Sequence, residues 1–198
     1  MGTTEVNSRP LKPAVFLDRD GTINVEKNYL YRIEDFEFIP GAPEAIKRLK
    51  DAGFLIVVVT NQSGVARGYY SLEDVDRLHT HIQDELNRYD TSIDAFYVCP
   101  HHPTDGEGEY LLECDCRKGN PGMLLQAAED MGVDLKHSWM VGDKAADIEA
   151  GGRAGCRSIL VETGYGDADN VLALYPDSLI ASDIFGAVKE IITQSTTN

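Results

Sequence analysis

The sequence predicts an α/β fold of three layers, in which a parallel sheet lies between two layers of helices. Short runs rich in β-branched residues alternate with longer helix-like segments along the chain, and this alternation is typical of βαβ units. Crossover connections of this kind make the strands parallel and cover both faces of the sheet with helices. With 198 residues, of which 42% are hydrophobic and 8 are prolines, the chain has the size and composition of one folded domain.

The expected strands are the β-branched runs, at 14–17, 54–60, 93–98, 138–141 and 158–161. The expected helices lie between and after them, at 44–52, 72–89, 121–131, 145–154 and 184–192. Gly53 and Gly132 follow two of these helices as terminating glycines, and Ser71 with Asp74 three positions later is a capping signal. We therefore expect one domain over 13–192, with flexible tails at 1–12 and 193–198, and we find no internal repeat.

The chain is strongly acidic, with 33 Asp and Glu against 18 Lys and Arg and a net charge of −15. Such a charge repels nucleic acid and anionic membrane surfaces, so neither is expected as a partner. The longest apolar run, 54–59, is too short to span a bilayer, and the N-terminal residues lack the pattern of a secretory signal. We expect a cytoplasmic monomer that acts on a small molecule.

Two carboxylates follow the first predicted strand, in the sequence Asp18-Arg19-Asp20-Gly21-Thr22. Open α/β sheets bind ligands at the carboxyl ends of their strands, so acids at this position face a crevice and not a packed interior. The alternative is a polar turn that ends in a permissive glycine. We interpret Asp18 and Asp20 as candidate catalytic residues.

Three further polar motifs lie at the ends of predicted elements: Thr60-Asn61-Gln62-Ser63-Gly64, Arg117-Lys118 and Gly142-Asp143 with Asp147 one helical turn later. Separately, each has an ordinary interpretation as a polar loop, a solvated basic pair or an acid that complements a helix dipole. Together, the acids Asp18, Asp20 and Asp143 can hold Mg²⁺, while Thr60 and Lys118 bind phosphoryl oxygens. This combination predicts phosphoryl-transfer chemistry.

A second group of residues consists of Cys99, His101, Cys114 and Cys116, at the two ends of a polar loop. Cys₃His is a ligand set of structural zinc sites, and a reducing cytosol favours metal binding over disulfides. His102 is the alternative imidazole, but alternate residues of an extended segment point to one side, which favours His101. Free reduced thiols are the other interpretation, for which so polar a loop offers little apolar cover. We expect a structural Zn²⁺ here.

The four ordered motifs, Asp18-x-Asp20-Gly21-Thr22, Thr60, Lys118 and Gly142-Asp143-x-x-x-Asp147, resemble those of the haloacid dehalogenase-like (HAD) superfamily. The resemblance implies a Rossmann-like sheet, attack on phosphorus by Asp18, and proton transfer by Asp20, whose pKa we then expect to be raised. It also implies Mg²⁺ bound by Asp18, the main-chain carbonyl of Asp20 and Asp143, with Thr60 and Lys118 stabilising the phosphoryl group.

The short segment between the first two strands, and the zinc loop before Lys118, leave no room for a large cap domain. Superfamily members that resemble this chain in having a zinc loop act on a heptose bisphosphate or on histidinol phosphate. The segments that look more like the heptose branch are 18–24, 36–39, 60–64, 99–103 and 121–125. That resemblance implies substrate contacts from Glu26, Lys27, Asn28, Tyr29, Thr60, Asn61, Gln62, Ser63, Arg117, Lys118 and Lys144.

The resemblance therefore implies a Mg²⁺-dependent phosphatase that removes the 7-phosphate of D-glycero-D-manno-heptose 1,7-bisphosphate in nucleotide-activated heptose biosynthesis. Histidinol-phosphate phosphatase is the alternative, with the same catalytic residues. A receiver-like phosphoacceptor signalling domain also has an acidic Mg²⁺ pocket. Because a receiver needs a stable phosphoaspartate, the second acid Asp20 discriminates against that interpretation.

Overall fold

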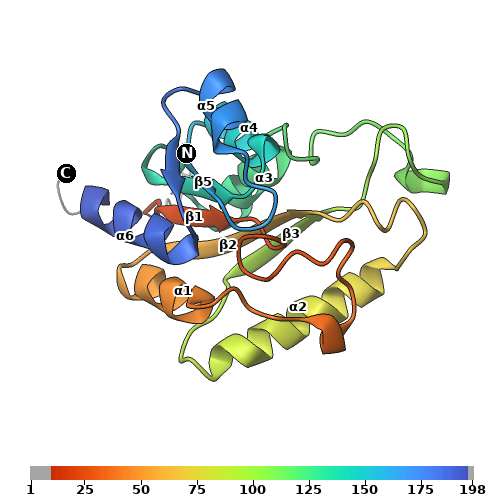
Figure 1. The fold of residues 1–198 in the computed structure, drawn as a ribbon, viewed down its shortest axis with the longest axis horizontal. Helices are drawn as coiled ribbons and strands as arrows, with labels where there is room; N and C mark the ends of the chain where they lie inside the picture. The colour runs from red at the N-terminus through yellow and green to blue at the C-terminus, as the bar shows by residue number, and fades with distance from the viewer. Residues whose placement is uncertain (1–9, 196–198) are drawn as a thin grey trace, which may run out of the picture.

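The computed structural model describes residues 10–195, which form a six-stranded parallel sheet between two layers of helices (Figure 1). The strands are β1 (Ala14–Leu17), β2 (Leu55–Asn61), β3 (Ala95–Cys99), β4 (Trp139–Gly142), β5 (Arg157–Val161) and β6 (Leu179–Ala181). Their order in the sheet is β3-β2-β1-β4-β5-β6, and every neighbouring pair is parallel. The predicted three-layer α/β fold is confirmed.

The helices divide between the two faces of the sheet (Figure 1). One face is covered by α1 (Ala42–Asp51), α2 (Leu72–Asn87) and α6 (Ile184–Ser195), and the other by α3 (Gly122–Met131), α4 (Ala145–Ala154) and α5 (Ala168–Leu174). Three 3₁₀ turns lie in the connections, at η1 (Ile33–Asp35), η2 (Gly108–Tyr110) and η3 (Leu135–His137). None of the helices in residues 10–195 has the length and apolar character needed to cross a membrane.

Strand β1 shows why two helical layers form. All four of its residues are buried, and successive side chains of a strand point to opposite faces of the sheet. Val15 and Leu17 belong to the core beneath α1, α2 and α6, while Ala14 and Phe16 belong to the core beneath α3 and α4. A strand that is apolar on both faces therefore needs helical cover on both.

Two helix ends follow the predicted capping signals. At the start of α2, the Asp74 N–H donates to Ser71 Oγ (3.2 Å) and the Ser71 N–H donates to Asp74 Oδ2 (2.8 Å). At the end of α3, Gly132 has a φ of 69°, a left-handed conformation that glycine adopts without steric cost. The local sequence thus determines where these helices begin and end.

Three features differ from the sequence prediction. The helix α5 and the edge strand β6 were not expected, because α5 buries only Val171 and the three residues of β6 are half-buried. Helix α6 continues to Ser195, so the part of the predicted C-terminal tail that the structure describes is helical. The backbone of Lys12, in the predicted N-terminal tail, is hydrogen-bonded to the α3–β4 connection. The Lys12 N–H donates to Gly132 O (3.0 Å), and the Asp134 N–H donates to Lys12 O (2.8 Å). The remaining predicted tail residues, 1–9 and 196–198, lie outside the described residues.

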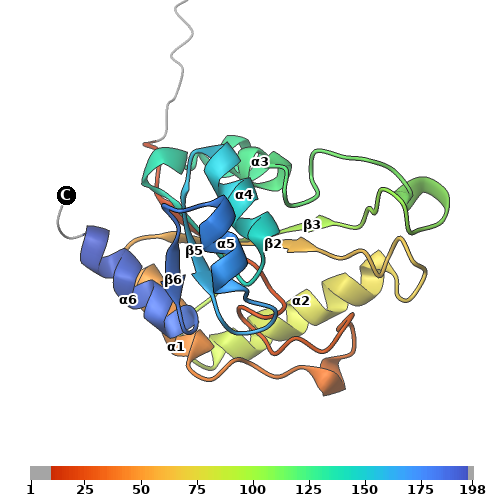
Figure 2. The ribbon, with the colours of Figure 1, turned by 45° about the horizontal axis from the view of Figure 1, so that its top comes forward.

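The strand order reverses direction between β1 and β4, and ligands bind at such a point in open α/β sheets. The Asp18 N–H donates to Val141 O (2.9 Å), so the residues that follow β1 and β4 emerge side by side. A long connection from β3 to α3 extends beyond the sheet, next to the turn that follows β2 (Figure 2). The Glu107 N–H donates to Ala66 O (2.8 Å) and holds these two connections together.

Candidate active site

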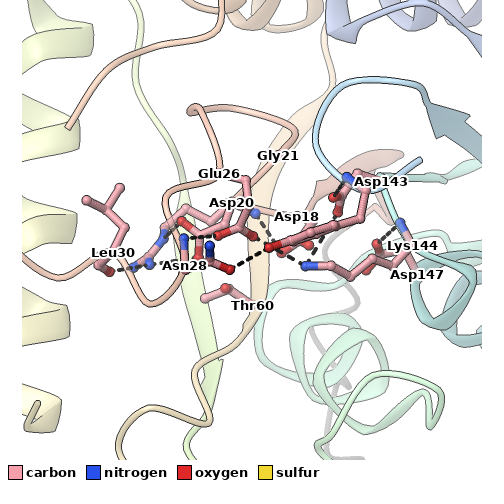
Figure 3. Close-up of polar contacts among 12 residues, drawn as sticks. Asp18, Asp20, Gly21, Glu26, Asn28, Leu30, Thr60, Asp143, Lys144 and Asp147 are labelled. Carbon is pink, nitrogen blue, oxygen red and sulfur yellow. Dashed lines mark hydrogen bonds and ion pairs between the residues drawn. The ribbon is translucent and has the colours of Figure 1, made fainter. Parts of the chain in front are cut away.

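Three carboxylates converge at the ends of β1 and β4 (Figure 3). Asp18 follows β1, Asp143 follows β4, and Asp147 lies in the first turn of α4. One oxygen of each lies within 4.8 Å of the others, and none of the three residues is more than 4% exposed. We call them the acid cluster. The Lys118 Nζ lies between two of them, 2.6 Å from Asp18 Oδ1 and 2.7 Å from Asp147 Oδ1.

Burial makes Asp18 and Asp143 costly to ionise. It raises the pKa of Asp18 to about 7 against the attraction of Lys118, and it raises the pKa of Asp143 to about 6. Burial alone would lower the pKa of Lys118, but Asp147 and Asp18 raise it, so the lysine stays charged.

One oxygen of the acid cluster is left without a partner. Asp143 Oδ1 is buried and has no hydrogen bond among the described residues, and Lys144 Nζ lies 3.9 Å away. Buried polar atoms are almost always satisfied, so an orphaned carboxylate oxygen among crowded acids indicates a site for a cation. Mg²⁺ prefers carboxylate and carbonyl oxygens, and the acid cluster fits it.

Two glycines allow the backbone to approach Asp143 closely. Gly21 (φ 84°) and Gly164 (φ 76°) have left-handed backbones, and a Cβ at either position would lie 2.4 Å from Asp143 Oδ2. The same oxygen accepts a hydrogen bond from the Tyr165 N–H (2.8 Å). Asp143 is therefore fixed by backbone from the loops that follow β1 and β5.

The Asp20 side chain lies outside the acid cluster. It accepts two hydrogen bonds from the Arg19 guanidinium (2.8 and 3.1 Å) and one each from Asn24 Nδ2 and Gln62 Nε2 (both 2.9 Å). Burial acts to raise the pKa of Asp20, but the Arg19 charge and these hydrogen bonds outweigh burial and lower the pKa. The expectation of a raised pKa is wrong for this state, because the neighbouring arginine folds back onto the carboxylate.

Arg19 is itself fully buried and anchored on two further elements. Its Nη2 donates to Leu30 O (3.0 Å), and its Nη1 lies 3.3 Å from His79 Nε2 on α2. Burial and the Arg19 charge lower the pKa of His79 to about 3, so the imidazole is neutral and accepts this hydrogen bond. The guanidinium therefore connects Asp20 to α2 and to the loop after β1.

A cavity of about 240 Å³ lies next to the acid cluster and is lined by Asp18, Asp20 and Asp147. Thr60, at the end of β2, is buried in its lining, and the Thr60 hydroxyl accepts a hydrogen bond from Gln62 Nε2 (2.8 Å). The cavity thus joins carboxylates, a hydroxyl and the Lys118 ammonium, the groups that phosphoryl transfer requires.

Most of the predicted substrate-contact residues line this cavity: Glu26, Asn28, Tyr29, Thr60, Asn61, Gln62, Ser63, Lys118 and Lys144. Lys27 does not, because its Nζ pairs with Glu37 (3.0 Å) on the surface. Arg117 lines a neighbouring pocket and donates to His101 O (3.1 Å).

Two tyrosines that the sequence interpretation did not select also line the cavity, Tyr70 and Tyr165. The Tyr70 hydroxyl donates to Gln62 Oε1 (2.7 Å). Tyr165 follows β5, the neighbour of β4 in the sheet. Its place after a strand end was the sequence signal that could have marked it as a site residue. A larger cavity of about 540 Å³ lies at the opposite end of β4 and β5, but among residues 10–195 Asp177 is the only acid in its lining.

The four predicted zinc ligands also come together, with all four ligand atoms within 4.8 Å of one another. The Cys114 Sγ is 3.6 Å from Cys99 Sγ and 3.2 Å from Cys116 Sγ, and His101 Nδ1 is 3.2 Å from Cys116 Sγ. Tetrahedral zinc with bonds of about 2.3 Å to sulfur needs ligand separations of roughly 3.7 Å, so this set fits zinc.

His102, the alternative imidazole, has a different role. Its Nδ1 accepts hydrogen bonds from the Asp105 N–H (2.9 Å) and the Thr104 N–H (3.3 Å), which are the next residues of the same loop. The four thiols of the chain are free of disulfides. The structure therefore selects His101, as the alternation of an extended segment predicts.

The strand order, the aspartates after β1 and β4, and the buried lysine between them define a hydrolase of the HAD-like class. A family model described as HAD-hydrolase-like matches residues 115–187. The D-glycero-beta-D-manno-heptose-1,7-bisphosphate 7-phosphatase of Pasteurella multocida is 48% identical over 155 residues, which cover 78% of this chain and 84% of that protein. The D-glycero-D-manno-heptose-1,7-bisphosphate 7-phosphatase of Thermosynechococcus vestitus is 46% identical over 192 residues, which cover 92% and 96%.

A solved structure is similar over nearly the whole chain. The D,D-heptose 1,7-bisphosphate phosphatase from B. bronchiseptica, in complex with magnesium and phosphate, has a TM-score of 0.80 at 32% identity, over 92% of this chain and 99% of that chain. The chain belongs to the heptose-1,7-bisphosphate 7-phosphatase family of HAD-like hydrolases.

Proposed function

We propose that this chain is a Mg²⁺-dependent phosphatase that removes the 7-phosphate of D-glycero-D-manno-heptose 1,7-bisphosphate. The observation that carries the proposal is the acid cluster with Lys118, at the point where the strand order reverses and beside a polar cavity. The substrate is inferred from the names of the relatives. The chemistry is inferred from the residues.

Asp18 is the proposed nucleophile. Its Oδ1 accepts a hydrogen bond from the Arg19 N–H (2.7 Å) and lies 2.6 Å from Lys118 Nζ, so the carboxylate has a fixed orientation. Attack of a carboxylate oxygen on phosphorus forms an aspartyl-phosphate and breaks the bond to the sugar oxygen. Division of one slow displacement into two faster steps is the advantage of such an intermediate.

Asp20 is the proposed acid and base, two residues from the nucleophile and in the lining of the same cavity. A bound phosphoryl group brings negative charge close to Asp20 and favours its protonated form, which gives a proton to the departing alkoxide. Asp20 is then a carboxylate, the form that Arg19 stabilises, and it takes a proton from the water that hydrolyses the aspartyl-phosphate.

The remaining phosphoryl oxygens are assigned to the Thr60 hydroxyl and the Lys118 ammonium. The proposed ligands of Mg²⁺ are Asp18, Asp143 and the main-chain carbonyl of Asp20. When bound there, the ion neutralises charge on the phosphoryl group. Asp147 is assigned a supporting role, because it pairs with Lys118 (2.7 Å) and accepts a hydrogen bond from the Lys144 N–H (2.9 Å).

Zn²⁺ at Cys99, His101, Cys114 and Cys116 is proposed to be structural. Four protein ligands close its coordination sphere, and no position is left for a substrate. The last ligand, Cys116, is two residues before Lys118, so the metal fixes the start of the segment that carries the lysine.

The test is phosphate release from both anomers of the heptose 1,7-bisphosphate, with and without Mg²⁺, beside histidinol phosphate at matched concentrations. We expect the bisphosphate to be preferred, and ³¹P NMR of the product to show that the 1-phosphate remains. Asp18→Asn is expected to lose at least about 10³-fold in kcat with the fold intact. The matched control is Asp76→Asn, at an exposed position on α2.

Preference for histidinol phosphate would overturn the substrate and leave the catalytic residues as assigned. An Asp18→Asn variant with wild-type turnover would overturn the assignment of the nucleophile. Release of the 1-phosphate in place of the 7-phosphate would overturn the regiochemistry.

A further inference from the structure

Tyr165 occupies a position at the mouth of the cavity that joins three parts of the site. Its N–H donates to Asp143 Oδ2 (2.8 Å), and its hydroxyl donates to Asn28 Oδ1 (2.5 Å) on the opposite loop. Its ring centroid lies 5.0 Å from Lys144 Nζ, within the range of a cation–π interaction. Figure 3 shows Asn28 on one side of the site, and Asp143 and Lys144 on the other.

The loop that Tyr165 contacts has a strained backbone. Asn28 and Tyr29 are consecutive residues with left-handed φ values of 52° and 62°, a conformation that is unfavourable for a bulky side chain such as tyrosine. The Asn28 N–H donates to Glu26 Oε1 (2.8 Å), and the Tyr29 ring packs edge-on against Tyr69 (5.0 Å). Such strain persists where the surroundings hold it in place, and it is concentrated at ligand clamps and active sites.

The two groups that Tyr165 holds have unused binding capacity. With the Asn28 oxygen taken by the phenol, the Asn28 Nδ2 faces no acceptor among the described residues and remains free to donate. The Lys144 side chain is 42% exposed, and its Nζ lies 3.5 Å from Glu26 Oε2. An amide donor and a cation thus stand on opposite sides of one cavity, beyond the acid cluster.

We propose that Tyr165 is a positioning residue that holds Asn28 and Lys144 across the mouth of the cavity, where they bind the polyhydroxy and second-phosphate part of the substrate. This proposal rests on the proposed function, because it concerns the part of the substrate that does not react. The chemistry that the two groups recognise is an anion next to hydroxyls. A small aryl phosphate has no second anion and no hydroxyls apart from the phosphate that reacts.

Tyr165 is well suited to a mutational test, because it is 53% exposed and contributes little to the core. Tyr165→Phe removes the bond to Asn28 and keeps the ring near Lys144. Asn28→Gly removes the amide and keeps a residue that tolerates a positive φ. The matched control is Tyr89→Phe, an exposed tyrosine just beyond the far end of α2.

The experiment compares kcat and KM for the heptose 1,7-bisphosphate and for p-nitrophenyl phosphate. We expect Tyr165→Phe to lower kcat/KM for the bisphosphate roughly fivefold, mainly through KM, as the loss of one hydrogen bond does. The loss on p-nitrophenyl phosphate is expected to be at least about threefold smaller. The double variant Tyr165→Phe/Asn28→Gly is expected to lose no more kcat/KM for the bisphosphate than Asn28→Gly alone, because the Tyr165 hydroxyl acts through the Asn28 amide.

Equal losses of Tyr165→Phe on both substrates would overturn the proposal, since they would show a general structural role. Additive losses in the double variant would also overturn it, since the phenol would then not act through Asn28. If the wild-type enzyme prefers another phosphate ester over the bisphosphate, the proposed function fails separately. The same variants are then measured on the preferred ester, and the same two outcomes decide the role of Tyr165.

Discussion

Replacement of Arg19 by methionine tests whether the buried guanidinium holds Asp20 in place. The Arg19 side chain is fully buried, whereas 14% of the Asp20 side chain is exposed. The guanidinium makes two hydrogen bonds to Asp20, one to Leu30 O, and one contact with His79. Methionine has a similar length and fills much of the same space, but it offers no donor to any of these groups.

The expected loss of stability follows from the groups that the substitution leaves behind. Removal of one partner of a buried ion pair typically costs 3–5 kcal/mol, because an uncompensated charge remains. Asp20 keeps its hydrogen bonds from Asn24 and Gln62 and has a partly exposed edge, so we expect the lower end, about 3 kcal/mol. For a chain of this size, that loss lowers Tm by roughly 6–12 °C.

The measurement is equilibrium unfolding in urea, followed by circular dichroism, with Tm as a second measure. Arg77→Met on α2 is the matched control, because Arg77 pairs with Glu73 and Asp74 on the surface, where ion pairs contribute little. Arg19→Lys keeps the charge but offers a single donor group and is expected to fall between wild type and Arg19→Met. A loss below about 1 kcal/mol for Arg19→Met would refute the reasoning.

Three further predictions concern the metal sites. The raised pKa values of about 7 for Asp18 and about 6 for Asp143 mean that the folded state binds protons more tightly than the unfolded chain. Stability without Mg²⁺ should therefore fall as pH rises from about 4 to 7, and Mg²⁺ should reverse most of the fall; a Tm that rises with pH in Mg²⁺-free buffer would contradict this. Cys116→Ser is expected to lose zinc and to lower kcat/KM roughly 10²-fold. Cys156→Ala, outside the cluster, is expected to keep its zinc and its wild-type kcat/KM, and metal analysis and kinetics would show both results. Gly21→Ala and Gly53→Ala both strain a positive φ, but only the former places a Cβ against the acid cluster, so only Gly21→Ala should weaken Mg²⁺ binding in calorimetry.

The fold and most of the site were predictable because their signals are local. Buried strands such as β1 are continuous apolar runs, and the polar residue that follows each run must lie at the carboxyl edge of the sheet. Asp18, Thr60 and Asp143 were selected in this way. The Cys/His cluster was predicted because few other arrangements explain three thiols and an imidazole in a polar loop, and the structure brings the four side chains together.

The features that could not be predicted depend on contacts between distant segments. The lowered pKa of Asp20 depends on Arg19, whose direction is set by Leu30 and by His79, sixty residues away. Tyr165 joins the site through Asn28, across 137 positions of sequence. Lys27, next to Asn28, turns outward to Glu37, and no periodicity in the loop indicates which of these neighbours faces the cavity.

Lys118 lies in a loop, but contacts with neighbouring segments fix its position as firmly as that of a residue at a strand end. The N–H of Lys118 donates to Asn61 Oδ1 (2.9 Å) after β2, and the N–H of Gly119 donates to Ala146 O (3.0 Å) in α4. Cys116, a proposed zinc ligand, lies on the other side of the same short segment. The acids that we propose as Mg²⁺ ligands, Asp18 and Asp143, directly follow β1 and β4 and do not depend on these contacts for their position. We therefore predict that loss of zinc impairs stabilisation of the phosphoryl group by Lys118 and leaves the affinity of the acid cluster for Mg²⁺ intact, because the two proposed metals serve separable parts of the site.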